Sequence, residues 1–463
     1  MPALPPFDAE LLRRYDRPGP RYTSYPTAPH FIEKFDARAY RLAARESNAD
    51  PIPRSLSLYV HVPFCLSPCF YCGCNRIITR DLGRAERYLG HVQREIGLVA
   101  PLFDRDREVV QLHLGGGTPN FLKPELMEQL VLSLGREFKF STRADRDFSI
   151  ELDPRSVDAA GIARLAEIGF NRASLGVQDF DPDVQEAVNR IQSVEETLAV
   201  IEACRAHGFR SINIDLIYGL PRQSLEGFAR TLDTVIAVRP ERLAVYSYAH
   251  LPDLFKAQKQ IKVEDLLPPE MKLRLLQLAI EKLSAAGYHY IGMDHFALPE
   301  DELARAQRDG SLQRNFMGYT THAETDLIGL GMSAISRIGD HFSQNARELG
   351  AYVAAVEADR QPVIRGLDLD GDDVLRADLI QHLMCQGEID KRDLESRYGI
   401  DFDAYFAGSL EQLPPLIEDG LVTHEPGWIR VTERGRLLMR VVAMCFDRYL
   451  QNPAQPVRFS RAI

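Results

Sequence analysis

Four cysteines within ten residues constrain this chain more than any other part of its sequence. Cys65, Cys69 and Cys72 follow the spacing C-x3-C-x2-C, and Cys74 comes two residues later. Thiolates held this close together repel one another unless they bind a metal ion or a metal cluster. A [4Fe–4S] cluster held by three cysteines of one loop, with one iron left open, fits the spacing best.

Two other interpretations of the cysteines stay open. A structural zinc ion would take all four thiolates, but zinc ligands usually come from two separated pairs. A redox disulfide could join Cys69 and Cys72, yet it would leave Cys65 without a role. The three remaining cysteines lie alone in apolar segments, where free cysteine usually packs in the core: Cys204, Cys385 and Cys445.

The composition narrows the class of protein. Hydrophobic residues make up 45% of the 463 residues and charged residues 26%, as in an ordinary globular protein. No apolar run approaches the roughly 20 residues of a membrane span, and the N-terminus lacks a signal-peptide core. We therefore expect a cytoplasmic protein, and nothing in the sequence requires more than a monomer. The net charge of −11 argues against nucleic acid as the main partner, so an anionic substrate needs a local basic pocket.

Repeated βα units predict a parallel sheet between residues 51 and 290. Short β-branched runs form six candidate strands, at 57–62, 109–114, 148–152, 172–176, 211–217 and 243–248. Helical patterns lie between them, near 83–100, 123–137, 157–168, 193–207 and 224–237. The strands run into polar, cysteine-rich or glycine-rich turns, and the carboxyl ends of parallel strands meet at one edge of a sheet. These turns favour a partial (β/α)6 barrel over an open doubly wound sheet.

Three further regions flank the predicted barrel. Residues 1–50 are rich in proline and form an N-terminal arm, whose aromatic residues favour packing over disorder. Residues 291–366 form a barrel extension and a connecting segment. Residues 367–463 form a C-terminal domain that is mainly helical.

The C-terminal domain has the pattern of a winged helix. Helices precede a predicted hairpin that turns at Pro426-Gly427, and a last helix is expected at 435–449. Between residues 367 and 450, however, seventeen acidic residues outnumber nine lysines and arginines. A module that neutralised phosphates would be basic, so we expect a packing or substrate-covering role and no contact with DNA.

The cysteine loop resembles that of the radical S-adenosylmethionine (AdoMet) superfamily, because the triad ends the first strand and an aromatic residue, Tyr71, precedes its third cysteine. A closer resemblance, over nearly the whole chain, is to the oxygen-independent coproporphyrinogen III oxidase family. The motifs that carry it are Pro20-Arg-Tyr-Thr-Ser-Tyr-Pro26, Tyr59-Val-His-Val-Pro-Phe-Cys65, Cys72-Gly-Cys-Asn75, Gly115-Gly-Gly-Thr-Pro119, Gly176-Val-Gln-Asp-Phe180, Asn213-Ile-Asp-Leu-Ile-Tyr-Gly-Leu-Pro221, Gly292-Met-Asp-His-Phe296 and Phe459-Ser-Arg-Ala-Ile463.

The resemblance implies a fold, a reaction and a set of cofactors. The fold is the partial barrel of the radical AdoMet type, with the arm and the winged-helix-like domain. The substrate is coproporphyrinogen III, two propionates of which undergo radical oxidative decarboxylation to vinyl groups, giving protoporphyrinogen IX in haem biosynthesis. A [4Fe–4S] cluster donates an electron to AdoMet, and two AdoMet molecules are expected. The electron donor and the final acceptor stay unidentified.

The same resemblance assigns roles to individual residues. Cys65, Cys69 and Cys72 match the three iron ligands. Cys74 is expected near the substrate, with a catalytic role that competes with a packing role. The positions that match the first AdoMet site are Tyr59, Gly116, Glu151 and Ile335. The positions that match the second are Tyr71, Gly117, Thr118, Gln178, Arg190, Asp215 and Ala249.

Two positions depart from the family pattern, and one alternative function remains. Tyr71 stands where phenylalanine is expected, and Met317 where glutamine is expected, which puts in doubt a polar contact to the second AdoMet. The alternative is a haem-trafficking chaperone of the same superfamily, but that group resembles a shorter chain without the counterpart of Cys74. Arg21 and Arg314 are candidates for binding substrate carboxylates, with ordinary salt bridges as the alternative.

Overall fold

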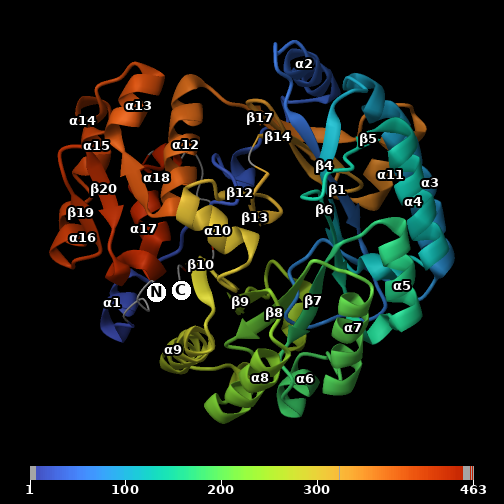
Figure 1. The fold of residues 1–463 in the computed structure, drawn as a ribbon, viewed down its shortest axis with the longest axis horizontal. Helices are drawn as coiled ribbons and strands as arrows, with labels where there is room; N and C mark the ends of the chain where they lie inside the picture. The colour runs from blue at the N-terminus through green and yellow to red at the C-terminus, as the bar shows by residue number, and fades with distance from the viewer. Residues whose placement is uncertain (1–6, 323, 452–458, 460, 462–463) are drawn as a thin grey trace. The chain divides into compact units, whose positions relative to one another are not determined.

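The computed structural model describes residues 7–322, 324–451, 459 and 461 (Figure 1). The first six residues of the predicted arm, and Ser460, Ala462 and Ile463 of the terminal motif, lie outside the described residues.

The chain divides into two compact units. The barrel unit comprises Phe31–Leu267 and Glu324–Asp368. The C-terminal unit comprises Met1–His30, Pro268–Ala323 and Leu369–Ile463. The division falls inside the predicted arm, inside the predicted barrel, whose residues 268–290 belong to the C-terminal unit, and inside the predicted connecting segment. Long-range packing groups segments that are distant in sequence.

Six parallel strands form the centre of the barrel unit, as the sequence predicts. They are β1 (Ser55–Val62), β4 (Glu108–Gly116), β6 (Asp147–Leu152), β7 (Arg172–Gln178), β8 (Ser211–Tyr218) and β9 (Arg242–Ser247). Each pairs in parallel with the next in this order. Their carboxyl ends therefore lie at one edge, which is the edge that carries the predicted site.

Five helices run along the outside of this strand row (Figure 1). They are α3 (Leu82–Val99), α4 (Pro124–Glu137), α5 (Ala159–Ile168), α7 (Val194–Ala206) and α8 (Leu225–Val238), which confirms the five predicted helices. Four of them begin at a side chain that accepts a hydrogen bond from the first turn: Asp81, Asp158, Ser193 and Ser224. A shorter helix, α6 (Pro182–Ala187), lies between β7 and α7.

Four more strands extend the sheet beyond β1. β14 (Thr325–Leu330) pairs with β1 in parallel, on the side opposite β4. β15 (Ile335–Ile338), β16 (His341–Asn345) and β17 (Val363–Asp368) then follow in antiparallel order. Two helices also belong to this unit, α2 (Ala37–Asn48) and α11 (Leu349–Glu357). The extension places the β14–β15 turn beside the carboxyl end of β1.

A buried ion pair fastens α2 and β14 to the barrel. Arg107 donates to Asp326 over 2.6 Å, and both side chains are almost fully buried. Arg107 also donates to Asn48 Oδ1 over 2.9 Å and to Arg54 O over 2.8 Å, while Asp326 accepts from Gly339 N over 2.8 Å. These partners satisfy both charged groups, which is the condition under which a buried pair is tolerated.

The C-terminal unit contains the predicted winged-helix-like module. α12 (Gly371–Gln386) and α13 (Lys391–Tyr398) flank β18 (Glu388–Asp390), which pairs with β20 (Trp428–Val431). β19 (Val422–His424) pairs with the other side of β20, and the backbones of Glu425 and Trp428 close the hairpin predicted at Pro426-Gly427.

The predicted last helix at 435–449 is wrong in its continuity. The chain forms a 3-10 helix (Glu433–Leu438), then α17 (Met439–Met444), and then a separate α18 (Arg448–Gln451). Asp447 accounts for the second break, because it accepts a hydrogen bond from Tyr449 N over 2.9 Å and one from Tyr22 OH over 2.9 Å. Tyr22 and Tyr25 of the arm are buried in this unit, so the arm packs as its aromatic content suggests.

The remaining elements of the C-terminal unit are one helix of 17 residues and a set of shorter helices and strands. They are α1 (Ala9–Tyr15), α9 (Pro269–Ala285), β10 (His289–Gly292), β11 (His295–Ala297), α10 (Glu302–Asp309), β12 (Gln313–Asn315), β13 (Gly318–Thr320), α14 (Phe402–Tyr405), α15 (Ala407–Leu410) and α16 (Pro414–Glu418). Among the described residues, no helix has the length and apolar content that crossing a bilayer requires.

Candidate functional site

A cavity of about 460 Å³ opens at the carboxyl ends of the parallel strands in the barrel unit. It brings together twelve of the fifteen predicted site residues, which lie in the loop after β1 and in or after β4, β6, β7 and β8. They are Cys65, Cys69, Tyr71, Cys72, Cys74, Gly116, Gly117, Thr118, Glu151, Gln178, Arg190 and Asp215. The convergence follows from the parallel order of the strands.

A short parallel pair of strands closes the base of the cysteine loop. β2 (Phe64–Cys65) pairs with β3 (Ile77–Ile78), so the loop begins and ends at neighbouring positions. Within it, Cys69 is buried, Cys65 and Cys72 are half-buried, and Cys74 is exposed. The seven cysteines are all free thiols. The redox disulfide between Cys69 and Cys72 is therefore not formed in this structure.

Hydrogen bonds and burial give the thiols different acidities. A hydrogen bond from Cys74 lowers the pKa of Cys72 to about 6, and the same hydrogen bond raises the pKa of Cys74 well above its usual range. Burial raises the pKa of Cys65 to about 11, against a hydrogen bond from Thr118 Oγ1 to its Sγ over 3.4 Å. The structure thus separates Cys74 chemically from Cys72.

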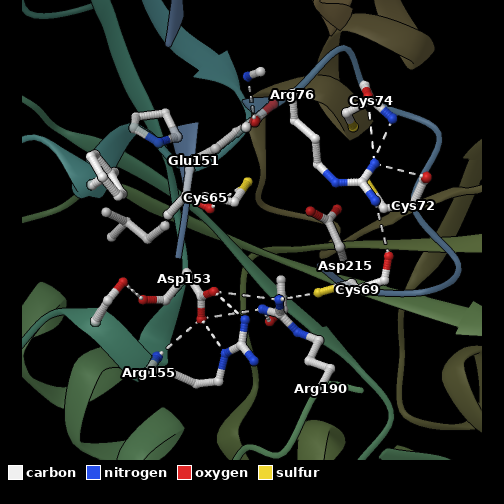
Figure 2. A pocket seen from close by; sticks show the side chains of 18 of the residues that line it. Cys65, Cys69, Cys72, Cys74, Arg76, Glu151, Asp153, Arg155, Arg190 and Asp215 are labelled. Carbon is white, nitrogen blue, oxygen red and sulfur yellow. Dashed lines mark hydrogen bonds and ion pairs between the residues drawn. The ribbon is translucent and has the colours of Figure 1, made fainter. Parts of the chain in front are cut away.

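Arg76 shapes the loop, and sequence reasoning missed it. Its guanidinium donates to the carbonyl oxygens of Cys72, over 2.9 Å, and of Cys69, over 3.1 Å (Figure 2). The side chain therefore crosses the loop from inside and brings a positive charge close to the thiols. The only signal in the sequence is a basic residue directly after Cys74-Asn75, which is too common to interpret alone.

Arg190 approaches the loop from another side of the cavity (Figure 2). Its Nη1 donates to Cys69 Sγ over 3.6 Å, and its Nη2 donates to Gly176 O over 2.6 Å. Asp153 lies 3.4 Å from Arg190 and forms a second ion pair, of 2.6 Å, with Arg155. Burial raises the pKa of Asp153, but the hydrogen bond from Arg155 and the charge of Arg190 outweigh it and lower the pKa overall.

Asp153 and Arg155 were not predicted as site residues. They follow the motif Glu151-Leu-Asp-Pro154, and only the fold shows that they face the cavity and not solvent. The proline directly after Asp153 was the available signal, because it ends the strand and begins a 3-10 helix (Pro154–Ser156) at the mouth.

Glu151 is organised for accepting hydrogen bonds. It accepts from Gly116 N over 3.0 Å and lies 3.4 Å from His113 Nε2. Burial raises its pKa, whereas His113 and the Gly116 N–H lower it, and the net shift is downward. The ring of Tyr59 stacks on His113 at 5.9 Å, which places Tyr59 next to Glu151 although it does not line the cavity.

The pKa of Asp215 is shifted upward, opposite to that of Glu151. Burial and the charge of Glu151 raise its pKa to about 6, even though it accepts hydrogen bonds from Asn213, over 2.9 Å, and Ser174, over 3.1 Å. Asp215 therefore takes up a proton as the pH falls through about 6, whereas Glu151 stays ionised there, so the two carboxylates differ in charge below that pH.

Gly116 and Gly117 form a wall on which no side chain fits. Gly116 has a φ of +118°, and an added Cβ would lie 2.5 Å from the His61 ring. An added Cβ on Gly117 would lie 2.7 Å from the carbonyl carbon of Pro63. The backbone itself is thus the surface of the cavity there, as close approach to a ligand requires.

Two further predicted residues lie near the cavity without lining it. Ala249 O accepts a hydrogen bond from Gln258 over 3.2 Å, and the same amide donates to Tyr71 O over 3.0 Å. Ile335 lies at the start of β15, and its carbonyl oxygen is so near Gly329 that a Cβ there would approach it to 2.5 Å. Gly329 pairs with Tyr59, so Ile335 lies beside the strand that carries Tyr59.

The two arginines suggested for substrate carboxylates belong to the C-terminal unit. Arg21 forms an ion pair with Asp294, and Arg314 donates to the carbonyl oxygens of Arg21 and Tyr22. Both guanidinium groups thus have partners within that unit. Met317, the departure from the family pattern, lies in the turn between β12 and β13.

The donors in the cavity suit an iron–sulfur cluster and AdoMet. In the described part of the chain, no three His, Cys, Asp or Glu side chains surround a single metal-sized point. A [4Fe–4S] cube offers separate irons at separate corners, so its three cysteines need not meet at one point. The Nε atoms of Arg76 and Arg190 are buried without a hydrogen-bond partner among the described residues, so the cavity holds donors for a polar ligand.

Comparison with known proteins places the chain in a class. Residues 59–235 match the family model of the radical SAM superfamily, and residues 369–438 match the model of the HemN C-terminal domain. The solved structure of coproporphyrinogen III oxidase (HemN) from Escherichia coli, a radical SAM enzyme, has a TM-score of 0.91 and 46% identity. It covers 97% of this chain and 100% of that chain. The fold is that of a radical SAM enzyme, which confirms the predicted fold class.

Similarity to curated relatives identifies the family within this class. The oxygen-independent coproporphyrinogen III oxidase of Pseudomonas aeruginosa is 50% identical over 99% of both chains. The protein of the same name from Escherichia coli K12 is 48% identical over 99% of this chain and 98% of its own. The chain belongs to the oxygen-independent coproporphyrinogen III oxidase family.

Proposed function

We propose that this chain is an oxygen-independent coproporphyrinogen III dehydrogenase. It converts two propionate side chains of coproporphyrinogen III to vinyl groups by radical oxidative decarboxylation, as a step of haem biosynthesis. The observation that carries the proposal is the identity of about half of all residues with coproporphyrinogen III oxidases over 99% of this chain. The cavity at the carboxyl ends of the barrel strands supports it.

Cys65, Cys69 and Cys72 hold the [4Fe–4S] cluster in this proposal. Bound AdoMet and the cluster together supply a 5′-deoxyadenosyl radical, which is the chemistry the side chains lack. The three thiols come from a loop that surrounds Arg76. The guanidinium of Arg76 donates hydrogen bonds to two carbonyl oxygens of this loop, and these bonds fix the spacing of the thiols. Metal-ligating thiols must lose their protons, and the neighbouring positive charge favours that loss.

The cavity residues bind two AdoMet molecules in distinct ways. Glu151 and Gly116, with Tyr59 and Ile335 behind them, serve the first molecule, whose ammonium and ribose groups suit a carboxylate held ionised. For the second, the guanidinium of Arg190 offers a fork to a carboxylate. The other positions of the second site are Tyr71, Gly117, Thr118, Gln178, Asp215 and Ala249.

Cys74 is a catalytic residue near the substrate in this proposal. Cys74 is the most exposed residue of the four cysteines, the hydrogen bond to Cys72 raises the pKa of its thiol well above the usual range, and it lines the same cavity. The alternative function, a haem-trafficking chaperone, does not need this thiol. Cys74→Ser should keep iron and sulfide content while product formation falls at least tenfold. Full activity of the variant would contradict the catalytic role.

The cellular setting is also a proposal. We place the protein in the cytoplasm as a monomer, with an electron donor and a terminal acceptor that are still to be identified. The arm at 1–50, the barrel at 51–290, the extension at 291–366 and the C-terminal domain at 367–463 are proposed as its functional regions. Limited proteolysis followed by mass spectrometry tests these boundaries.

Anaerobic product analysis tests the function directly. The protein is reconstituted with iron and sulfide and then mixed with coproporphyrinogen III, AdoMet and dithionite. Vinyl products and methionine are expected, and Cys69→Ser should form neither. A protein that binds porphyrin but yields no vinyl product would favour the chaperone, and a colourless zinc protein would contradict both.

A further inference from the structure

A buried carboxylate, Glu95, lies away from the cavity and has no role in the chemistry described above. It is 1% exposed and lies near the C-terminal end of α3, on the face that packs against the sheet extension. Three donors converge on it, from Gly331 N over 2.7 Å, Asn345 Nδ2 over 2.7 Å and Tyr352 OH over 2.6 Å. A buried carboxylate that accepts three hydrogen bonds fixes the segments that donate them.

The held element is the turn between β14 and β15. Glu95 accepts from the backbone N–H of Gly331, and Asn345 donates both to Glu95 and to Gly331 O, over 2.9 Å. Gly331 has a φ of +90°, and an added Cβ would lie 2.4 Å from the Tyr88 hydroxyl. Both the N–H and the carbonyl group of Gly331, the first residue of the turn, are therefore held by hydrogen bonds.

Tyr88 ties the same turn to the strand that leads into the cysteine loop. Its hydroxyl accepts from Met332 N over 2.9 Å and donates to His61 O over 2.8 Å. His61 in turn bonds through Nε2 to Asn75 O over 2.9 Å, at the far end of the cysteine loop. Tyr88 also packs its ring on Tyr352, at 5.7 Å between centroids. One polar network thus joins α3, α11, the β14–β15 turn and the cysteine loop.

We infer that Glu95 is a positioning residue for AdoMet, which it serves by fixing the β14–β15 turn against the end of β1. The inference rests on the proposed function, because that turn leads into Ile335, and Ile335 lies beside the strand of Tyr59. Glu95 touches neither cofactor nor substrate. It acts through its hydrogen bonds to the Gly331 N–H and to the side chains of Asn345 and Tyr352, so it governs the affinity for AdoMet and leaves the chemical step unchanged.

The network also makes AdoMet affinity depend on pH. Burial raises the pKa of Glu95 to about 7, against the opposing effect of its three donors. The titratable groups that face it are Tyr352, Tyr88 and Tyr40, and in the described part of the chain no Lys, Arg or His forms an ion pair with it. Above pH 7 the carboxylate accepts all three bonds. Below pH 7 the added proton occupies one acceptor position, and of the three partners only the Tyr352 hydroxyl can accept, so at least one of the three bonds donated to Glu95 is lost.

The first experiment measures AdoMet affinity across pH. The dissociation constant of AdoMet for the anaerobically reconstituted wild type should rise about three- to tenfold between pH 8 and pH 6, the loss of one hydrogen bond. Glu95→Gln, whose side chain does not titrate, should bind weakly at pH 8 and show no such step. Glu86→Gln, an exposed acid on the same helix, is the matched control and should follow the wild type.

The kinetic pattern separates positioning from general damage. Glu95→Gln should raise the KM for AdoMet by a similar factor and change kcat by less than about twofold. Glu95→Asp keeps the charge but shortens the reach, and it should restore the pH step without the full affinity. An equal loss of kcat in Glu95→Gln, or a pH step that persists in it, would overturn the inference.

Hydrogen exchange tests the network in the chain without cluster or AdoMet. The backbone amides of Gly331 and Met332 should exchange at least fivefold faster in Glu95→Gln, and Tyr88→Phe should speed the Met332 amide. If the wild type made no vinyl product but these amides still responded, the proposed function would fail while the turn-fixing role of Glu95 stood. Unchanged exchange at both amides would contradict that role itself.

Discussion

Replacing Gly117 with alanine should displace the cysteine loop and impair AdoMet binding, although it adds a single methyl group. Gly117 N donates to Val62 O over 2.8 Å, and Thr118 N donates to Phe64 O over 2.8 Å. These two hydrogen bonds connect the turn after β4 to the segment just before Cys65. The new methyl group would lie between the two connected segments.

The size of the displacement follows from the contacts. The added Cβ would lie 2.7 Å from the carbonyl carbon and oxygen of Pro63, and ordinary contact begins at 3.4 Å. The backbone ahead of Cys65 must therefore move by about 0.7 Å, since Pro63 is main chain and cannot rotate away. Overpacking of this kind costs about 1–3 kcal/mol of stability, and a shift of about 1 Å at a reacting centre costs up to about a hundredfold in rate.

The assay compares Gly117→Ala with Gly97→Ala. Gly97 lies in α3 with nothing within 4 Å of an added Cβ, so alanine there should stabilise the chain by about 0.5–1 kcal/mol without changing turnover. Gly117→Ala should fold, bind AdoMet at least tenfold more weakly and lose about a hundredfold in anaerobic turnover. Wild-type affinity and turnover in Gly117→Ala would refute the argument that backbone packing sets the loop.

Three further outcomes test the electrostatics of the fold and site. Arg107→Met should destabilise the chain by about 3–5 kcal/mol in urea unfolding, because Asp326 is left buried and unpaired, and adding Asp326→Asn should recover most of the loss. Arg190→Lys should bind AdoMet at least tenfold more weakly while circular dichroism stays unchanged, since an ammonium cannot reproduce the bonds to Gly176 O and Cys69 Sγ. The raised pKa of Asp215, about 6 against 3.8, means that its stability contribution is present below pH 3.8 and lost as pH rises through 6. Asp215→Asn should therefore gain on the wild type by about 3 kcal/mol above pH 6, measured on the cluster-free chain; an unchanged difference across pH would contradict this.

The sequence predicted the parts of the site that depend on local pattern. β-branched runs ending in glycine, proline or cysteine turns located all six barrel strands, and the parallel order then sent their loops to one edge. The spacing of the cysteine triad, to which we assign the proposed ligand role, is equally local. Residues whose role depends on a distant partner were missed: Arg76 turns back across its own loop, and Arg155 faces the cavity only because Asp153 holds it there.

Helix continuity failed for a related reason. The pattern at 435–449 is apolar and periodic enough for one helix, but Asp447 caps a new helix and binds Tyr22 from the opposite end of the chain. A hydrogen bond between residues separated by more than four hundred positions leaves no local trace. Tertiary contacts override propensity at such points, whereas helices with local caps, such as Ser193 with Glu196, are predicted well.

The charges of the cavity explain how an acidic chain can assemble a site for thiolates and carboxylates. The chain carries a net charge of −11, yet three arginines line this cavity, Arg76, Arg155 and Arg190, against three carboxylates. One carboxylate, Asp153, is paired with two of the arginines, and another, Asp215, has its pKa raised to about 6. Arg76, which touches the cysteine loop, pairs with none of these carboxylates in the described part of the chain, so its positive charge stays available to thiols that would bind iron as thiolates. Replacing Arg76 or Arg190 should lower cluster retention more than it lowers the stability of the fold. Both side chains face the cysteine loop, and neither lies in the core of the sheet.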